Sequence, residues 1–579
     1  MVHRQHRGTM RALRNRAFGW GTVLIILGVL LGYPLIMLLL QAVFPGLQVG
    51  GSGALTPSFQ AFVTFIHDPL SLSAMAHTAV LALSVATLAT IAGTLLMVLF
   101  HRRPPPMRPL WPMLTWALFL APSFVIAEGF DLMGMPNGLF DRVFGLHNIS
   151  VPLLFSPYGV GFVLGIRLLP IAMITIDSAL RGMGDEFRDA ARTLGAQSWL
   201  VYLRVVLPLL RPALMATFFV IFAEAAGDFG VAATLGYDSH WLLLSYLIYQ
   251  SLSTFPANFG LAAVQSMALM GIVALAQLLE KTTASKRSRF SVLHGNRHVH
   301  AAHQQSWLTT VLFAIVFAMG LLIPLLSYLW IALTRGLSGS GIGQLTLHNF
   351  VLALHTPMLA GSLSRSVEYS LAVAVVALSI GLYLSAMTDR EVSQTVTRWL
   401  TATIAIPGLI LGISYIFAWN AGWLTNIGLN IYGTHWVLIL AYTAGVLPFV
   451  VRMLGAAFAQ IDPNLMSAAR ALGVGRATRL WRITVPLVLP ALGSTFLLVV
   501  TGVLFELPAS ELLYPAGSPT LAVEIVHQFH NFNYGVGAAL TLMGMIVALA
   551  FTAAWRLVES RWMGSWREAR SSTERRDAV

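Results

Sequence analysis

Long apolar runs, separated by short polar stretches, dominate this 579-residue chain. A hydrocarbon core of about 30 Å requires about 20 apolar helical residues to cross it. Runs of this kind predict two sets of six spanning helices, near residues 20–44, 77–100, 109–131, 156–180, 208–235 and 257–280, and near 307–333, 367–388, 399–420, 436–457, 488–514 and 534–558. The pattern therefore predicts an all-α membrane protein with about twelve transmembrane helices.

The composition agrees with this pattern and excludes several classes of site. Hydrophobic residues make up 57% of the chain and charged residues only 10%, with no cysteine; a soluble domain of this length would not have this balance. The lack of cysteine excludes disulfides and thiolate metal sites. The first run is too long for a signal peptide and lacks a small-residue cleavage site, so we expect a retained membrane anchor.

Basic residues cluster at the ends of particular runs, and the net charge is +12. Because short cytoplasmic segments are enriched in Lys and Arg, these clusters place both termini in the cytoplasm and attribute the charge to topology, not to nucleic-acid binding. The clusters precede the first run, follow the second and follow the sixth: Arg4, Arg7, Arg11, Arg14 and Arg16; Arg102, Arg103 and Arg108; Lys281, Lys286, Arg287 and Arg289.

A duplicated loop follows the fourth run of each set. The two copies lie 278 residues apart and share an alanine pair, a glycine and a proline at the same spacing: Asp189, Ala190, Ala191, Gly195 and Pro208 in the first loop (about 183–208), and Ser467, Ala468, Ala469, Gly473 and Pro486 in the second loop (about 461–486). Because each set has an even number of spans, the repeat is parallel and both loops face the same side.

Each loop carries the start and stop signals of a short helix. In the first loop Asp185 is a typical cap, and Gly195 suits the left-handed position after the last turn. In the second loop Asp462 is the cap, Pro463 occupies the first helical position and Gly473 ends the helix. We therefore expect two short helices with defined ends.

The repeat divides the chain into a first domain (1–285), a linker (286–306) and a second domain (307–579) with a basic cytoplasmic tail. The linker is polar and basic and shows no apolar periodicity. Two interpretations of its histidines remain open, a solvated tether and a metal-binding tract: His294, His298, His300 and His303.

The duplicated loop resembles the EAA loop of ATP-binding-cassette (ABC) importer permeases, and the resemblance covers essentially the whole chain. It implies that each loop forms a coupling helix that docks on a cytoplasmic ATPase. The glutamate of the family is replaced by Asp189 in one copy and by Ser467 in the other. Arg192 and Arg470 follow the alanine pairs, and either polar docking or positive-inside charge explains them.

The chain has no phosphate-binding loop, and its only lysines, Lys281 and Lys286, lie at or near the linker. We therefore expect no enzymatic activity and no cofactor on this chain, with ATP and magnesium bound by a separate ATPase homodimer on the cytoplasmic face. The resemblance further implies a periplasmic or lipid-anchored substrate-binding protein, a multi-pass location in the bacterial inner membrane and contact with membrane lipid, but no nucleic-acid partner.

Carboxylates recur at equivalent places in the fifth span of each set. Asp228 corresponds to Glu506 by the 278-residue spacing, and Glu224 and Glu511 lie near them. Ionisable groups inside spans usually face a cavity or a partner, so these four are candidate pathway residues that attract cations. Nearby glycines and Pro508 favour a second interpretation, in which the carboxylates cap broken helices.

The sequences around these carboxylates, Asp228-Phe229-Gly230 and 506–511, resemble the fused permeases of ferric-iron importers. This resemblance makes ferric iron the expected cargo, with thiamine, polyamine or aminoethylphosphonate as alternatives on the same architecture. Two further hypotheses are a secondary transporter driven by an ion gradient and a membrane scaffold or channel. The secondary transporter offers no reason for two matched polar loops, and uptake against a gradient in proteoliposomes would exclude the scaffold or channel.

Overall fold

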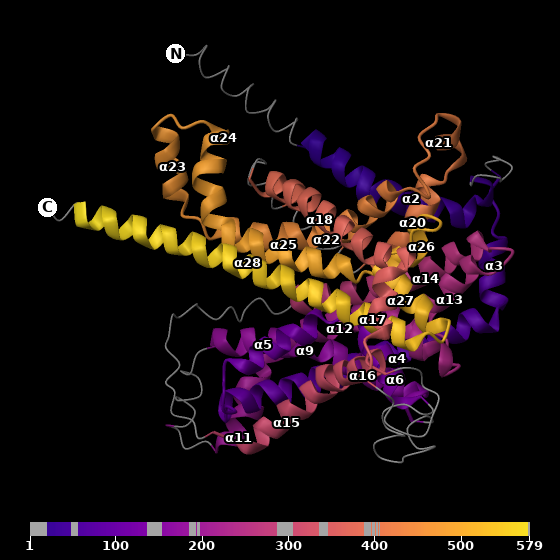
Figure 1. The fold of residues 1–579 in the computed structure, drawn as a ribbon, viewed down its shortest axis with the longest axis horizontal. Helices are drawn as coiled ribbons and strands as arrows, with labels where there is room; N and C mark the ends of the chain where they lie inside the picture. Colours follow the sequence, from indigo (N-terminus) through magenta and orange to yellow (C-terminus); the bar gives the residue numbers. More distant parts are fainter. Residues whose placement is uncertain are drawn as a thin grey trace, which may run out of the picture. The chain divides into compact units, whose positions relative to one another are not determined.

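The computed structural model describes residues 20–47, 56–135, 153–183, 193, 197–285, 305–334, 345–386, 395, 400, 403 and 406–576. Throughout these ranges the regular elements are helices (Figure 1). The prediction of an all-α membrane protein is confirmed.

Ten helices within the described ranges are long and apolar enough to cross a membrane: Trp20–Val43, Pro69–Arg102, Pro157–Met183, Tyr202–Gly227, Phe259–Thr282, Trp307–Ala332, Pro357–Ser385, His435–Ala459, Leu480–Leu504 and Tyr534–Ser560. Each matches a predicted span.

The two remaining predicted spans, the third of each set, are irregular. In the first set, α5 (Leu110–Leu120) and α6 (Ser123–Gly134) meet at a bend of 94°. In the second set, α20 (Gly408–Trp419) is a shorter apolar helix. Pro122 and Pro407 directly precede α6 and α20. Because proline lacks the N–H that continues a helix, each α-helix starts afresh after it.

The chain forms two compact units. One contains residues 38–349 and 405–413, and in it α4 (Pro69–Arg102) packs on both α9 (Pro157–Met183) and α12 (Leu207–Gly227), while α14 (Phe259–Ser285) packs on α12. The other helices of this unit include η2 (Pro45–Leu47), α3 (Gln60–His67), α11 (Ser198–Val201), η3 (Tyr202–Val206), η4 (Ala232–Gly236), α13 (Leu244–Ser253), α15 (Trp307–Phe317), η6 (Ala318–Leu322) and α16 (Ile323–Ala332).

The other unit contains residues 1–37, 350–404 and 414–579. Here α18 (Pro357–Ala386) packs on α22 (His435–Ala459) and on α25 (Val485–Leu504), and α28 (Tyr534–Arg576) packs on α25 and α27 (Leu521–His530). Its remaining helices include η1 (Gly28–Gly32), α21 (Gly422–Asn426), α23 (Pro463–Ala471), α24 (Arg476–Arg479), η7 (Leu480–Thr484) and α26 (Pro508–Leu513). Three helices have residues in both units: α2 (Tyr33–Val43), α17 (His348–His355) and α20 (Gly408–Trp419).

Each unit includes residues from the first span of the other sequence repeat. In one unit, the Tyr415 hydroxyl donates to the Leu30 carbonyl at 2.8 Å, and η1 packs on α22. In the other, the Tyr328 hydroxyl of α16 donates to the Val125 carbonyl of α6 at 2.6 Å. The compact units and the sequence repeats 1–285 and 307–579 are therefore different divisions of the chain, and the division into repeats stays a prediction about sequence.

The 278-residue spacing also relates irregular local structure. The five-residue π-helix η3 corresponds to η7, and each is followed at once by a long helix with Pro208 or Pro486 near its start. Each long helix contains a second proline, Pro212 or Pro490. π-Segments inside helices are uncommon and frequently lie at functional sites. Their presence at equivalent positions makes this region a candidate functional region in both repeats.

Candidate functional site

The second loop contains a short helix with the predicted ends. The Asp462 side chain accepts a hydrogen bond from Asn464 N at 2.8 Å, and Pro463 is the first residue of α23. Gly473 has a φ of +73°. Gly473 N donates to Arg470 O at 3.0 Å and Val474 N donates to Ala469 O at 3.1 Å, which is the Schellman arrangement at a helix C-terminus.

The side chains of α23 leave most of its surface available to a partner. Ser467, Ala468 and Arg470 are exposed, whereas Ala469 is buried. Arg470 Nε donates to the Met466 carbonyl at 3.2 Å, so this guanidinium lies along its own helix. In Figure 1, α23 and α24 form a hairpin beyond the end of α25.

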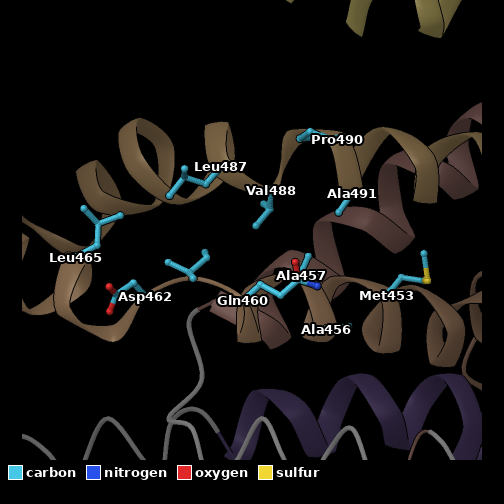
Figure 2. A pocket seen from close by; sticks show the side chains of 11 residues that line it. Met453, Ala456, Ala457, Gln460, Asp462, Leu465, Leu487, Val488, Pro490 and Ala491 are labelled. Atoms are coloured by element: carbon cyan, nitrogen blue, oxygen red, sulfur yellow. The ribbon is translucent and has the colours of Figure 1, made fainter. Parts of the chain in front are cut away.

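Large apolar side chains surround this hairpin. Leu465, Leu472 and Trp481 are 43%, 82% and 64% exposed. A cavity of about 620 Å³ lies between the end of α22, the start of α23 and the start of α25. Figure 2 shows Ala457 and Gln460 on one side of it and Leu487 and Val488 on the other. The second loop therefore combines a rigid capped helix with an apolar, incompletely packed base.

The corresponding helix of the first loop lies outside the described residues. This applies to Asp185, Asp189, Ala190, Ala191, Arg192 and Gly195, and also to the linker histidines. The described part begins again near η3 and α12, where Pro208 has the position that Pro486 has in the second repeat.

Asp228 lies at the break after α12 and caps the segment that follows. Its carboxylate accepts a hydrogen bond from Val231 N at 2.8 Å, and its carbonyl accepts one from the Ser245 hydroxyl at 2.8 Å. Gly230 lies so close to α6 that a Cβ at this position would overlap the Ser123 hydroxyl and lie 2.6 Å from Phe124 N. The break thus depends on both the carboxylate and the glycine.

Glu506 has the same relation to α26 in the second repeat. Its carboxylate accepts hydrogen bonds from Ala509 N at 2.8 Å and from Ser510 N at 3.0 Å. The Ser510 hydroxyl adds a third at 2.7 Å and lies 2.5 Å from the Tyr442 hydroxyl. The capping geometry that the sequence suggested as one interpretation is present at both carboxylates.

Glu224 lies one turn before Asp228 and faces a charged residue that we did not single out from the sequence. Arg167 Nη1 of α9 is 3.8 Å from Glu224 Oε2. Arg167 also interacts electrostatically with Asp228. Its Nε atom is buried and has no hydrogen-bond partner. A charge inside the predicted span 156–180 was the available signal for this residue, by the same rule that selected the carboxylates.

Glu511 belongs to a second polar cluster, between the spans Leu480–Leu504 and Tyr534–Ser560. Its carboxylate lies 3.5 Å from His527 Nε2, and Glu524, which is 2% exposed, accepts a hydrogen bond from Gln528 at 2.7 Å. The hydrogen bond with Glu511 raises the pKa of His527, against the opposite effect of burial. Among the described residues no three acidic or histidine side chains are arranged to hold a metal ion.

Comparison with known proteins places these features in a family. The family model described as "Binding-protein-dependent transport system inner membrane component" matches residues 93–279 and 377–564. The chain belongs to this family. One match lies within each repeat, and the two matches confirm the expected duplication. This family consists of permease subunits of ABC importers, which are multi-pass inner-membrane components without catalytic activity and which function with a substrate-binding protein and an ATPase.

Some relatives are named for a cargo, and these cargoes differ. The probable ABC transporter permease protein y4fN of Sinorhizobium fredii is 26% identical over 76% of this chain and 78% of its own length. The ferric transport system permease protein FbpB of Actinobacillus pleuropneumoniae is 23% identical over 74% of this chain, which spans 63% of that relative. A Salmonella choleraesuis protein named for 2-aminoethylphosphonate transport, PhnV, is 27% identical over 44% of this chain and 94% of its own length.

Proposed function

We propose that this chain forms the complete translocation pathway of an ABC importer and that an ATPase homodimer binds its two loops, one subunit at each. The observation that carries this proposal is α23, a short helix with a side-chain cap and a Schellman terminus. Such a helix transmits displacement without fraying, because both of its ends are fixed by hydrogen bonds. Its exposed apolar residues supply surface for a partner to bury.

The charge distribution sets the membrane orientation in this proposal. Both termini and both loops lie in the cytoplasm under the positive-inside bias. A periplasmic or lipid-anchored binding protein delivers the cargo at the opposite face. Closure of the ATPase dimer moves both loop helices, the pathway opens outward, and hydrolysis resets it.

Ferric iron is the cargo that we propose. Support comes from the carboxylates of the fifth spans, since hard cations take oxygen ligands, and from relatives named for ferric transport. The same architecture suits thiamine, polyamine or aminoethylphosphonate, and the last is the cargo named for PhnV. Uptake by cells of labelled ferric iron, challenged in turn with each alternative, tests the cargo. Competition by thiamine or aminoethylphosphonate, without transport of iron, would replace ferric iron with that compound.

The absence of cysteine makes the docking proposal directly testable. A single Ser467→Cys substitution introduces the chain's one thiol at an exposed position of α23. We expect a bifunctional thiol reagent to cross-link this variant to the co-purified ATPase. Asn430→Cys is the matched control. Asn430 is exposed and lies just before the start of α22, whereas the second loop follows the end of this helix, so we expect no such product. Equal cross-linking at both positions, or none at Ser467→Cys, contradicts docking at the second loop.

A further inference from the structure

Arg167 and Glu224 form an ion pair between two spans of one unit. Arg167 lies ten residues after the start of α9 and sixteen residues before its end, near the middle of its span, whereas Glu224 lies three residues before the end of α12. A charged residue in the middle of a span is costly unless it faces a partner or water. The pair is therefore not an incidental feature of the apolar helices.

The geometry of the pair is loose. The distance of 3.8 Å between Arg167 Nη1 and Glu224 Oε2 exceeds that of a charge-assisted hydrogen bond. The Glu224 side chain is 45% exposed, whereas that of Arg167 is 20% exposed. Because a half-exposed carboxylate is costly against lipid, water or a polar solute is the favourable neighbour for it.

Three charges share this space. Asp228 interacts electrostatically with both Glu224 and Arg167, but its carboxylate is already engaged with Val231 N. The group carries two negative charges and one positive charge, which leaves a net attraction for a cation. Arg167 Nε has no hydrogen-bond partner, so this nitrogen of the guanidinium is not fixed by a hydrogen bond.

The second repeat lacks the pair altogether. The 278-residue spacing places Gly445 at the position of Arg167 and Gly502 at that of Glu224. A Cβ on Gly502 would meet no atom within 4 Å, so this position too borders open space. The capping carboxylate is present in both repeats, whereas the arginine and its partner are both present in one and both replaced by glycine in the other. The arginine and its partner are thus present together or absent together, and capping requires neither of them.

We propose that Arg167 is a tethered counter-ion of Glu224 and Asp228: its guanidinium occupies the place beside these carboxylates that a cationic cargo takes during passage. Arrival of the cargo displaces the guanidinium, and its return releases the cargo. The element prevents two carboxylates from trapping a highly charged cation. This inference rests on the proposed import of a cation, but not on that cation being iron.

Binding of terbium to the purified permease–ATPase complex tests the proposal, because Tb³⁺ is a hard trivalent cation with detectable luminescence. We expect Arg167→Gln to tighten terbium binding by about tenfold, since a competing positive charge is removed from a site of reduced dielectric. Adding Glu224→Gln is expected to abolish the gain. Arg181→Gln is the matched control, because it removes the same charge from the same helix at the exposed pair with Asp177; it is expected to leave binding unchanged.

Two outcomes would contradict the proposed counter-ion role of Arg167. Unchanged or weaker terbium binding in Arg167→Gln assigns the arginine to packing or to recognition of an anion. If Arg167→Gln yields no folded complex, Glu224→Gln alone decides, because the proposal requires it to weaken terbium binding, and unchanged binding contradicts it. Failure of ferric uptake by the unmodified importer would instead contradict the proposed cargo and would leave the terbium result intact.

Discussion

Asp228 and Glu506 stand in the same relation to the chain that follows them: each carboxylate accepts a hydrogen bond from the N–H three residues later, at 2.8 Å in both cases. The two residues are 278 positions apart. The same side-chain chemistry therefore re-starts the chain after the break in the fifth span of each repeat. A carboxylate in this position both satisfies a free amide and adds negative charge at membrane depth.

Amide substitution separates these two roles. Asn and Gln keep a side-chain oxygen that accepts the same N–H but remove the charge. We expect the double variant Asp228→Asn with Glu506→Gln to keep its melting temperature within a few degrees and to lose most uptake. Alanine at either position removes the cap as well, at a cost of about 0.5–2 kcal/mol, and is expected to lower the melting temperature of the purified complex. Unchanged uptake in the double amide variant would leave these carboxylates with the capping role alone.

Substitution of Gly473 tests the terminus of α23. Its φ of +73° is unfavourable for a branched residue, so Gly473→Val distorts the second loop. We expect this variant to hydrolyse ATP without importing cargo. Gly475→Val is the matched control, because Gly475 lies in the same loop, has no positive φ and has open space around a Cβ. The equivalent substitution of Gly195 is expected to uncouple in the same way. Normal uptake with cargo-stimulated hydrolysis in both Gly473→Val and Gly195→Val would disprove the coupling role.

Gly230 provides a test of the break after α12. A Cβ there would overlap Ser123 and approach the backbone of Phe124, so Gly230→Ala requires the chain to move. Overpacking of this kind typically costs about 1–3 kcal/mol, and we expect a lower melting temperature of the complex. Gly271→Ala in α14 meets no atom within 4 Å and is expected to be neutral or slightly stabilising. Equal melting temperatures for the two variants would contradict the close contact at Gly230.

His527 predicts a pH dependence of stability. Its pKa lies above the usual value of about 6.5 mainly because of the hydrogen bond with Glu511. A group whose pKa is raised by folding stabilises the protein fully below its unfolded pKa, and this contribution is lost as pH rises through the folded pKa. We expect the stability advantage of the unmodified protein over His527→Gln to shrink from pH 6 to pH 8, measured as the difference in melting temperature. A constant or growing difference would exclude this pair.

The sequence predicted those features that depend on local chemistry. Asp462, Pro463 and Gly473 specify the ends of α23 because capping, fixed φ and a left-handed residue act within a few positions of the chain. The lengths of the apolar runs predicted the spans, because the length of a run is also a property of consecutive residues. The 278-residue spacing then located equivalent carboxylates without any knowledge of the fold.

Long-range packing was not accessible in this way. Nothing in the runs around Leu30 and Tyr328 shows that each first span packs with the other repeat, because both runs are simply apolar. The ion pair of Arg167 and Glu224 depends on two helices whose relative register no periodicity defines. The sequence identified a charge in each span but not the pairing.

The proposed import of cargo uses ATP that another subunit hydrolyses. Reconstitution of the permease with its ATPase and loaded binding protein in proteoliposomes, followed by measurement of labelled ferric iron inside the vesicles, tests this import. We expect accumulation that requires both ATP and the binding protein and that persists when ion gradients are collapsed. Accumulation driven by an ion gradient without ATP would contradict it.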